Sequence, residues 1–138
     1  MKGDEMAVKR ITVHCLEIED KAGSLQKLLA DAASANVDFE CCAAFSAGGG
    51  LGQVYLSGKN EGALKAFAAK EGIATTAAAG FIIGGEDKVG AVMEALKGLA
   101  DVGISGLAGA AIVCDGQYRM LVVVDAADGD AAEKALGA

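Results

Sequence analysis

The sequence contains no proline and no tryptophan, and aromatic residues make up only 4% of its 138 positions. Because 53% of the residues are nevertheless hydrophobic, the core must be closely packed from Ala, Val, Leu and Ile side chains. No stretch rich in Pro or Ser interrupts the chain. We therefore expect any domains to be joined rigidly and not through a flexible linker.

No apolar run approaches the roughly 18 to 20 residues that a membrane-spanning helix needs, and residues 1–5 lack the apolar centre of a signal peptide. The net charge is -7, and the Lys and Arg residues are dispersed, so the sequence has no basic stripe for a phosphate backbone. These absences predict a cytoplasmic protein that binds neither membranes nor nucleic acid.

Recognisable catalytic and metal-binding patterns are also missing. The four cysteines, Cys15, Cys41, Cys42 and Cys114, form no Cys-x-x-Cys pair, and the two adjacent ones point to opposite faces of a predicted strand. We expect reduced thiols and no metal. His14 is the only histidine and belongs to no recognisable triad, so we expect a partly exposed strand residue. The sequence thus predicts a protein that is not an enzyme and that carries no cofactor.

What the sequence does contain is an internal repeat. Glu-Asp-Lys-x-Gly occurs at residues 19–23 and again at residues 86–90, an offset of 67 residues (86 − 19). At this offset the apolar positions Leu25, Leu28, Leu29 and Ala32 match Val92, Ala95, Leu96 and Leu99. Their spacing is that of one face of a helix. Each copy therefore predicts a helix that starts at the Gly, with backbone N–H groups suited to a small anion.

The first copy resembles the ACT domain, a ferredoxin-like module that binds amino acids or similar effectors. The signature of that family reads here as Asp20-Lys21-Ala22-Gly23-Ser24-Leu25, followed by Asn36-Val37-Asp38-Phe39 after the helix. The resemblance implies an α+β protein with two tandem βαββαβ repeats, at residues 1–78 and 79–138. The sequence departs from the family at Asp20 and Asp38, because effector-binding members often have Asn at these positions. Asp in place of Asn favours a cationic ligand or indicates that no ligand site exists.

Periodicity and turn residues place the elements along the chain. We expect strands at 9–17, 37–46, 51–57, 73–83, 104–114 and 118–125, and helices at 22–35, 60–71, 89–102 and from 128 onward. Asp20 is expected near the N-cap of the first helix, with its carboxylate favourably placed against the helix dipole, and Asn60 and Asp128 are expected to cap two others. The strand at 73–83 must serve both repeats, so the second repeat lacks a fourth strand of its own. Something has to cover that open edge, either the other sheet or a second chain.

The candidate ligand site lies at the two Gly loops. It comprises Asp20, Ala22, Gly23, Ser24, Leu25 and Asp38 in the first repeat, and Asp87, Gly90, Ala91 and Ser105 in the second. The resemblance implies that an amino acid offers its carboxylate to the N–H groups of Gly23 and Ser24 and its ammonium to Asp20 or Asp38. The second loop has fewer charges and should bind more weakly or be structural. Alternatively, both glycines only allow tight turns.

Together these features predict a non-enzymatic regulatory protein that binds a small molecule, most simply an amino acid. It should form a homodimer, with the ligand near a repeat or subunit interface, and it could regulate an enzyme in trans. The alternative is an interaction module without a ligand, which dimerises or docks on an enzyme.

Overall fold

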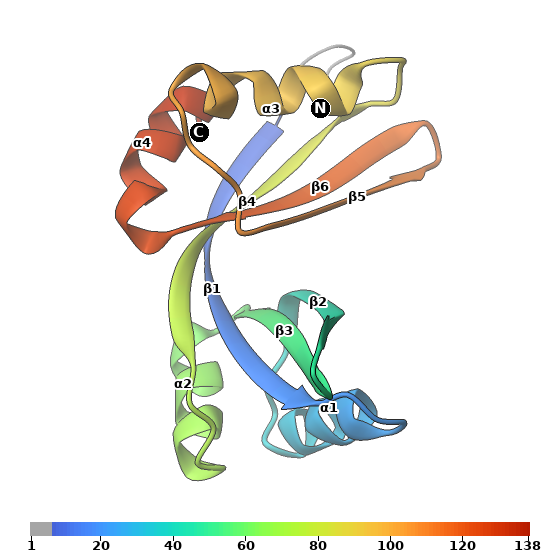
Figure 1. Cartoon of the computed structure of the whole chain (residues 1–138), viewed down its shortest axis with the longest axis vertical. Coiled ribbons are helices and arrows are strands. Elements are labelled where there is room, and N and C mark those ends of the chain that lie inside the picture. Colours follow the sequence, from blue (N-terminus) through green and yellow to red (C-terminus); the bar gives the residue numbers. More distant parts are fainter. Residues whose placement is uncertain (1–6) are drawn as a thin grey trace. The chain divides into compact units, whose positions relative to one another are not determined.

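The computed structural model describes residues 7–138 of the chain (Figure 1). These residues form six strands and four α-helices. The order is β1 (Ala7–Glu19), α1 (Ser24–Ser34), β2 (Phe39–Gly48), β3 (Leu51–Gly58), α2 (Glu61–Lys70), β4 (Thr76–Glu86), α3 (Ala91–Asp101), β5 (Ala108–Cys114), β6 (Gln117–Val124) and α4 (Gly129–Leu136). The predicted α+β class and the predicted order of elements are confirmed. No helix among residues 7–138 is long and apolar enough to cross a membrane.

The chain divides into two compact units, and the division runs through two strands. The N-terminal unit is Thr12–Ala77; the C-terminal unit combines residues 7–11 with Ala78–Ala138. Strands β1 and β4 therefore each contribute residues to both units. Each unit is described below on its own.

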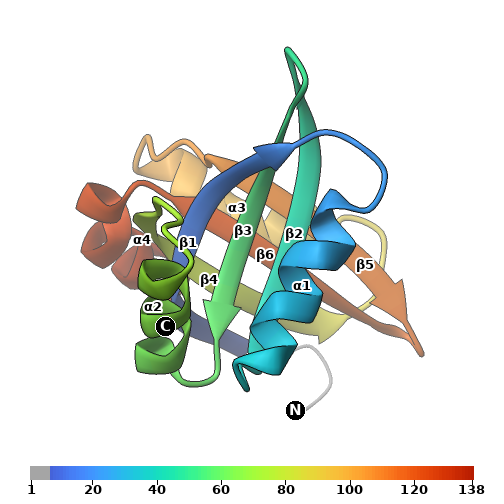
Figure 2. The same ribbon diagram turned by 90° about the horizontal axis from the view of Figure 1, so that it is seen from below.

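In the N-terminal unit, β3 lies between β2 and β1, and both pairs are antiparallel. Helices α1 and α2 cover one face of these strands (Figure 2). The core joins Leu28 and Ala32 of α1, Leu64 and Phe67 of α2, and the strand residues Leu16, Val54 and Leu56. Helix α2 begins and ends as predicted, because the Asn60 side chain accepts a hydrogen bond from the Ala63 N–H at 3.1 Å and Gly72 has a φ of 67°.

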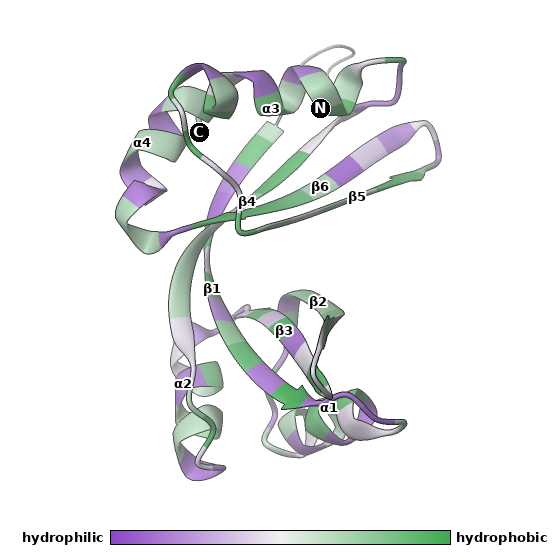
Figure 3. Ribbon diagram, viewed as in Figure 1, coloured by the Kyte–Doolittle hydropathy of each residue, from purple (hydrophilic) through white to green (hydrophobic). Residues whose placement is uncertain are grey.

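In the C-terminal unit, β6 lies between β4 and β5 in antiparallel pairing. Figure 3 shows the hydrophobic middle of β4, where Phe81 and Ile83 are fully buried against α3 and α4. The other neighbour of β4 is β1. The edge that we expected to be open is thus occupied by the N-terminal end of β1, where Arg10 also pairs with Asp130 and Glu133 of α4.

Two local predictions were wrong, those for Asp20 and His14, while the prediction for Asp128 holds for its position at the N-cap and not for a side-chain hydrogen bond. Asp20 does not cap α1, because Gly23 occupies the N-cap position and no side chain caps the helix. Asp128 stands at the N-cap of α4 without a side-chain hydrogen bond, and the Asp125 carboxylate instead accepts one from Ala127 in the preceding turn. His14 is buried and not partly exposed, since α2 covers its face of β1 and brings Glu61 Oε1 to 3.3 Å from its Nε2.

Candidate functional site

The first Gly loop (residues 19–24) leads from β1 into α1 through a backbone conformation that favours glycine. Gly23 has a φ of 89°, and a Cβ added there would meet no atom within 4 Å. Three backbone hydrogen bonds hold the loop, and one of them joins the Lys21 N–H to the Glu19 carbonyl at 3.1 Å. The Ser24 N–H donates to the Lys21 carbonyl at 3.2 Å, and the Asp20 N–H donates to the Gly50 carbonyl at 2.9 Å.

The second Gly loop (residues 86–91) repeats this arrangement between β4 and α3. Gly90 has a φ of 86°. The Ala91 N–H donates to the Lys88 carbonyl at 3.0 Å, and the Asp87 N–H donates to the Gly116 carbonyl at 2.9 Å. The repeated sequence therefore has a similar backbone geometry in both copies. In each, the Asp N–H donates a hydrogen bond to a glycine carbonyl in the neighbouring hairpin, Gly50 or Gly116.

The open N–H groups reach two residues further into the first helix than the predicted pair, Gly23 and Ser24. The Ser24 amide is used inside the turn, so it is not available for the predicted contact with a ligand carboxylate. In α1 the amides of Leu25 and Gln26 donate to no acceptor in residues 7–138, and in α3 the same holds for Val92 and Met93. Each helix start therefore presents a pair of uncapped N–H groups that can bind an anion.

A cavity of about 190 Å³ lies beside the first Gly loop. Asp20 and Leu25 line it, together with side chains that the sequence did not point to, Ser46 and Gln53 on the neighbouring hairpin. The Ser46 hydroxyl donates a hydrogen bond to the Asp20 carboxylate. Ala22, Gly23 and Ser24 do not line this cavity.

The second Gly loop has a larger cavity of about 600 Å³. Gly90 and Ala91 line it as predicted, while Asp87 does not. The remaining lining supplies charge and a hydroxyl, from Glu86, Lys88, Glu94 and Tyr118. Tyr118 reaches the loop from β6. The sequence pattern did not indicate that this strand lies near the repeated motif.

Asp38 and Ser105 stand at the opposite ends of the helices. The Val37 N–H donates to the Ala32 carbonyl at the last turn of α1, so the adjacent Asp38 lies a whole helix away from Gly23. An 11-residue helix is about 16 Å long. Asp38 pairs there with Lys59 at 3.0 Å, and Ser105 follows the end of α3 in the same way. Neither residue lines the cavity at its loop within one copy of the chain.

Two charged side chains near the first Gly loop form an ion pair at the surface. Lys21 Nζ lies 2.8 Å from Glu19 Oε2. This hydrogen bond lowers the pKa of Glu19 and raises the pKa of Lys21, so both groups stay charged at neutral pH. The first cavity therefore offers a ligand one cation, Lys21, and two carboxylates, those of Glu19 and Asp20.

Comparison with known proteins identifies the fold. No family model matches the sequence, and no curated protein matches it. Among solved structures, protein BT0572 from Bacteroides thetaiotaomicron has a TM-score of 0.73 at 12% identity, with 92% of this chain and 88% of that chain covered. The ligand-free regulatory subunit of aspartate kinase from Thermus thermophilus has a TM-score of 0.63 at 16% identity, covering 96% and 94%. The chain has an ACT-like fold.

A further structure supports this assignment. A C-terminal regulatory domain of aspartate kinase from Porphyromonas gingivalis W83 matches with a TM-score of 0.60 at 17% identity, over 96% of this chain and 95% of that chain. The resemblance drawn from Asp20, Gly23 and Leu25 is thereby confirmed at the level of the fold. In this ACT-like chain both Gly loops stand where a strand passes into the helix that follows it.

Proposed function

We propose that the chain is a non-enzymatic regulatory protein built from two tandem ACT-like repeats, which bind an amino acid at the Gly loops. The observation that carries this proposal is the duplicated loop geometry. Gly23 and Gly90 share one backbone conformation, and each stands before a helix start with two uncapped N–H groups. A tight turn that binds no ligand would explain the glycine. It would not explain why both helices also lack a side-chain N-cap.

The chemistry of an α-amino acid fits the groups at each loop. Its carboxylate can accept from the amides of Leu25 and Gln26, where the helix dipole also favours negative charge. Its ammonium can pair with Asp20, the carboxylate that lines the first cavity. At the second loop, Glu86 and Glu94 supply the negative charge. Because the cavity at the second loop is larger than the one at the first, it would accept an amino acid with a larger side chain.

Asp38 supports a homodimer as the working form. It stands about 16 Å from Gly23 along α1, so it can reach a ligand at the first loop only from a second copy of the chain. A ligand shared in this way would favour one assembly over another and so change what the protein regulates. The likeness to an aspartate kinase regulatory subunit, which is a separate chain, supports action on an enzyme in trans.

The test is thermal unfolding in the presence of each common amino acid at millimolar concentration and neutral pH. A ligand at about 100 times its Kd should stabilise the folded protein by roughly 2.7 kcal/mol and raise Tm by several degrees. Gly23→Val and Gly90→Val should each reduce this shift, because a branched side chain crowds the helix start and disfavours positive φ.

Gly72→Val is the matched control for these variants. Gly72 also has a positive φ, 67°, and open space around its Cβ position, but it ends α2 and lies at no loop cavity. All three variants should lose about 1 to 3 kcal/mol of stability. Only the loop variants should lose the ligand shift. An equal loss in Gly72→Val would show that the response tracks stability and not the site.

A ligand-free interaction module is the second candidate. One observation favours it, since the Asp20 carboxylate is already engaged by Ser46 and is not simply open to a ligand. Under that reading no amino acid changes Tm, and the exposed edge strands serve to bind another protein. A flat response across the whole panel would therefore replace the first proposal with this one.

A further inference from the structure

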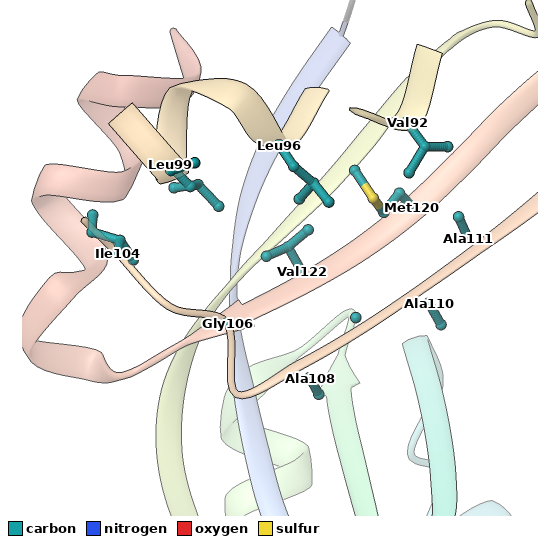
Figure 4. Close-up of a pocket in the computed structure, with 12 residues that line it drawn as sticks. Val92, Leu96, Leu99, Ile104, Gly106, Ala108, Ala110, Ala111, Met120 and Val122 are labelled. Atoms are coloured by element: carbon teal, nitrogen blue, oxygen red, sulfur yellow. The ribbon is translucent and has the colours of Figure 1, made fainter. Parts of the chain in front are cut away.

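The C-terminal unit contains an apolar groove that the Gly loops do not use. Six large side chains form most of its wall, Val92, Leu96, Leu99, Ile104, Met120 and Val122. Figure 4 shows Val92 and Leu96 extending from α3 toward the space above β6, from which Met120 and Val122 rise. The groove has a volume of about 490 Å³, and none of its lining residues has a polar or charged side chain. That volume is in the range of small-molecule sites.

The corresponding place in the N-terminal unit can be found from the sheet register. In the N-terminal unit, Leu56 of β3 has His14 of β1 on one side and Cys42 of β2 on the other. In the C-terminal unit, Val122 of β6 has Phe81 of β4 on one side and Gly109 of β5 on the other. Leu56 and Val122 are therefore equivalent, and Cys42 and Gly109 are equivalent at the same offset of 67 residues that relates the Gly loops. The groove can thus be compared with its counterpart residue by residue.

The decisive difference between the two places is Phe39. This side chain is half-buried and packs against the core cluster of the N-terminal unit, to which Leu25 and Leu29 of α1 and Val54 and Leu56 of β3 also belong. The same offset leads from Phe39 to Gly106, which lines the groove and has no side chain. Cys42, too, is replaced by Gly109. The groove is therefore the space that a benzyl side chain takes up in the other unit, left open in this one.

The local backbone at Gly106 does not need glycine. Its φ is not in the positive range, and an added Cβ would meet its nearest neighbours, the carbonyl oxygens of Ala108 and Val123, at 3.8 Å. This is ordinary van der Waals contact, so the backbone and its neighbours leave room for a Cβ at this position. An open apolar groove leaves the side chains around it without packing partners on one side. Leu96, which is 38% exposed, shows this directly.

We propose that this groove binds the aromatic ring of a small molecule. The occupant follows from the internal comparison, because the other unit closes the same space with a phenyl ring. The apolar lining requires that the inserted group be apolar too, since a polar group buried there would find no hydrogen-bond partner. Apolar cavities lined by aliphatic side chains bind benzene. This site is separate from the second Gly loop and does not depend on an amino acid binding there.

The test uses benzyl alcohol as the probe and methyl resonances of the folded protein as the readout. An aromatic ring in the groove should shift the methyl signals of Leu96, Ile104 and Met120 by its ring current. Gly106→Phe should weaken the binding of benzyl alcohol at least tenfold, because the new ring occupies the groove as Phe39 does in its own unit. Gly106→Leu provides a smaller filling residue should the phenylalanine disturb the fold.

Ile112→Phe is the matched control. Ile112 is on β5, the strand that follows Gly106, is 69% exposed and does not line the groove, so this variant should bind benzyl alcohol within about twofold of the original chain. Gly90→Val should also leave the probe unaffected, and this separates the groove from the Gly loops. Unchanged binding in both Gly106 variants would overturn the proposal. Equal affinity for 1-hexanol would overturn the aromatic ring as the occupant.

A second copy of the chain is the competing occupant. If benzyl alcohol moved no methyl signal while Gly106→Phe changed the oligomeric state in sedimentation, the groove would be a protein interface and the proposal would be wrong.

Discussion

Gly23 and Gly90 show how a single residue type shapes this protein. Both adopt a φ near 90°, where a side chain would be strained. A Cβ added at Gly23 would meet no atom within 4 Å, and one added at Gly90 would meet only the end of the Met93 side chain at 3.7 Å. Gly106 differs because nothing in its backbone requires glycine. The turn conformation explains the glycines at positions 23 and 90. The glycine at position 106 is explained by the apolar groove, which a side chain there would fill.

Cys41 leads to a prediction about pH. Burial on β2, with a smaller contribution from Cys42, raises the pKa of the Cys41 thiol from 9.0 to about 11. Alkylation by iodoacetamide requires the thiolate, so its rate at Cys41 should still be rising at pH 10 in the folded protein. In the urea-unfolded chain the rate should reach half of its plateau near pH 9 and level off above about pH 10. Peptide mass spectrometry of labelled protein measures both rates, and a plateau by about pH 10 in the folded protein would contradict the assignment.

The same shift affects stability with a defined sign. The folded protein holds the Cys41 proton more tightly than the unfolded chain does. Between pH 9 and about 11 the unfolded chain therefore loses its proton first, and the free energy of unfolding should fall across this window. Below pH 9 the thiol is protonated in both states and contributes no pH dependence.

At the scale of elements, the helix N-termini differ in a way that mutation can measure. Asn60 caps α2 with a side-chain hydrogen bond to Ala63, while Asp128 stands at the start of α4 without one. Asn60→Ala should therefore cost about 1 kcal/mol in the free energy of unfolding. Asp128→Ala should cost only about 0.3 kcal/mol, from the lost interaction with the helix dipole. Urea titration of both variants provides the comparison, and equal losses would contradict the role of the Asn60 side chain.

Local sequence signals were sufficient for most of the elements. Asn60 and Gly72 marked the ends of α2, and Asp115-Gly116 marked the hairpin between β5 and β6, where both residues have positive φ. The cap of α1 was missed because Asp20 bonds to Ser46, a residue on a different strand. Tyr118 at the second Gly loop and the groove above β6 were missed for the same reason. These features depend on which strands pair, and strand pairing is not a local property.

At the scale of the whole chain, the N-terminal end of β1 completes the C-terminal unit. Deleting residues 1–11 should remove the neighbour of β4 and the two ion pairs of Arg10, at 2.8 and 2.6 Å. An exposed strand edge then remains, which favours association. Hydrogen exchange should show lost protection in β4 and β6 and a smaller effect in β3. Unchanged exchange in β4 would contradict this.

Arg10→Ala is the matched control for the deletion. It removes only the ion pairs with Asp130 and Glu133, and because these pairs lie at the surface the loss should be below about 1 kcal/mol. A loss as large as that of the deletion would mean that the side chain of Arg10, and not the strand, holds the unit together.

The passage of β1 and β4 through both units also has a consequence for synthesis on the ribosome. Residues 8–11 emerge before the other strands, yet their partner strand β4 is complete only after Glu86, and β4 itself needs β6, which ends at Val124. The earliest strand must therefore wait unpaired while most of the chain is made. Contacts so distant in sequence form slowly. Chaperones that shield nascent strands should raise the yield of this protein more than they would for two units with separate strands.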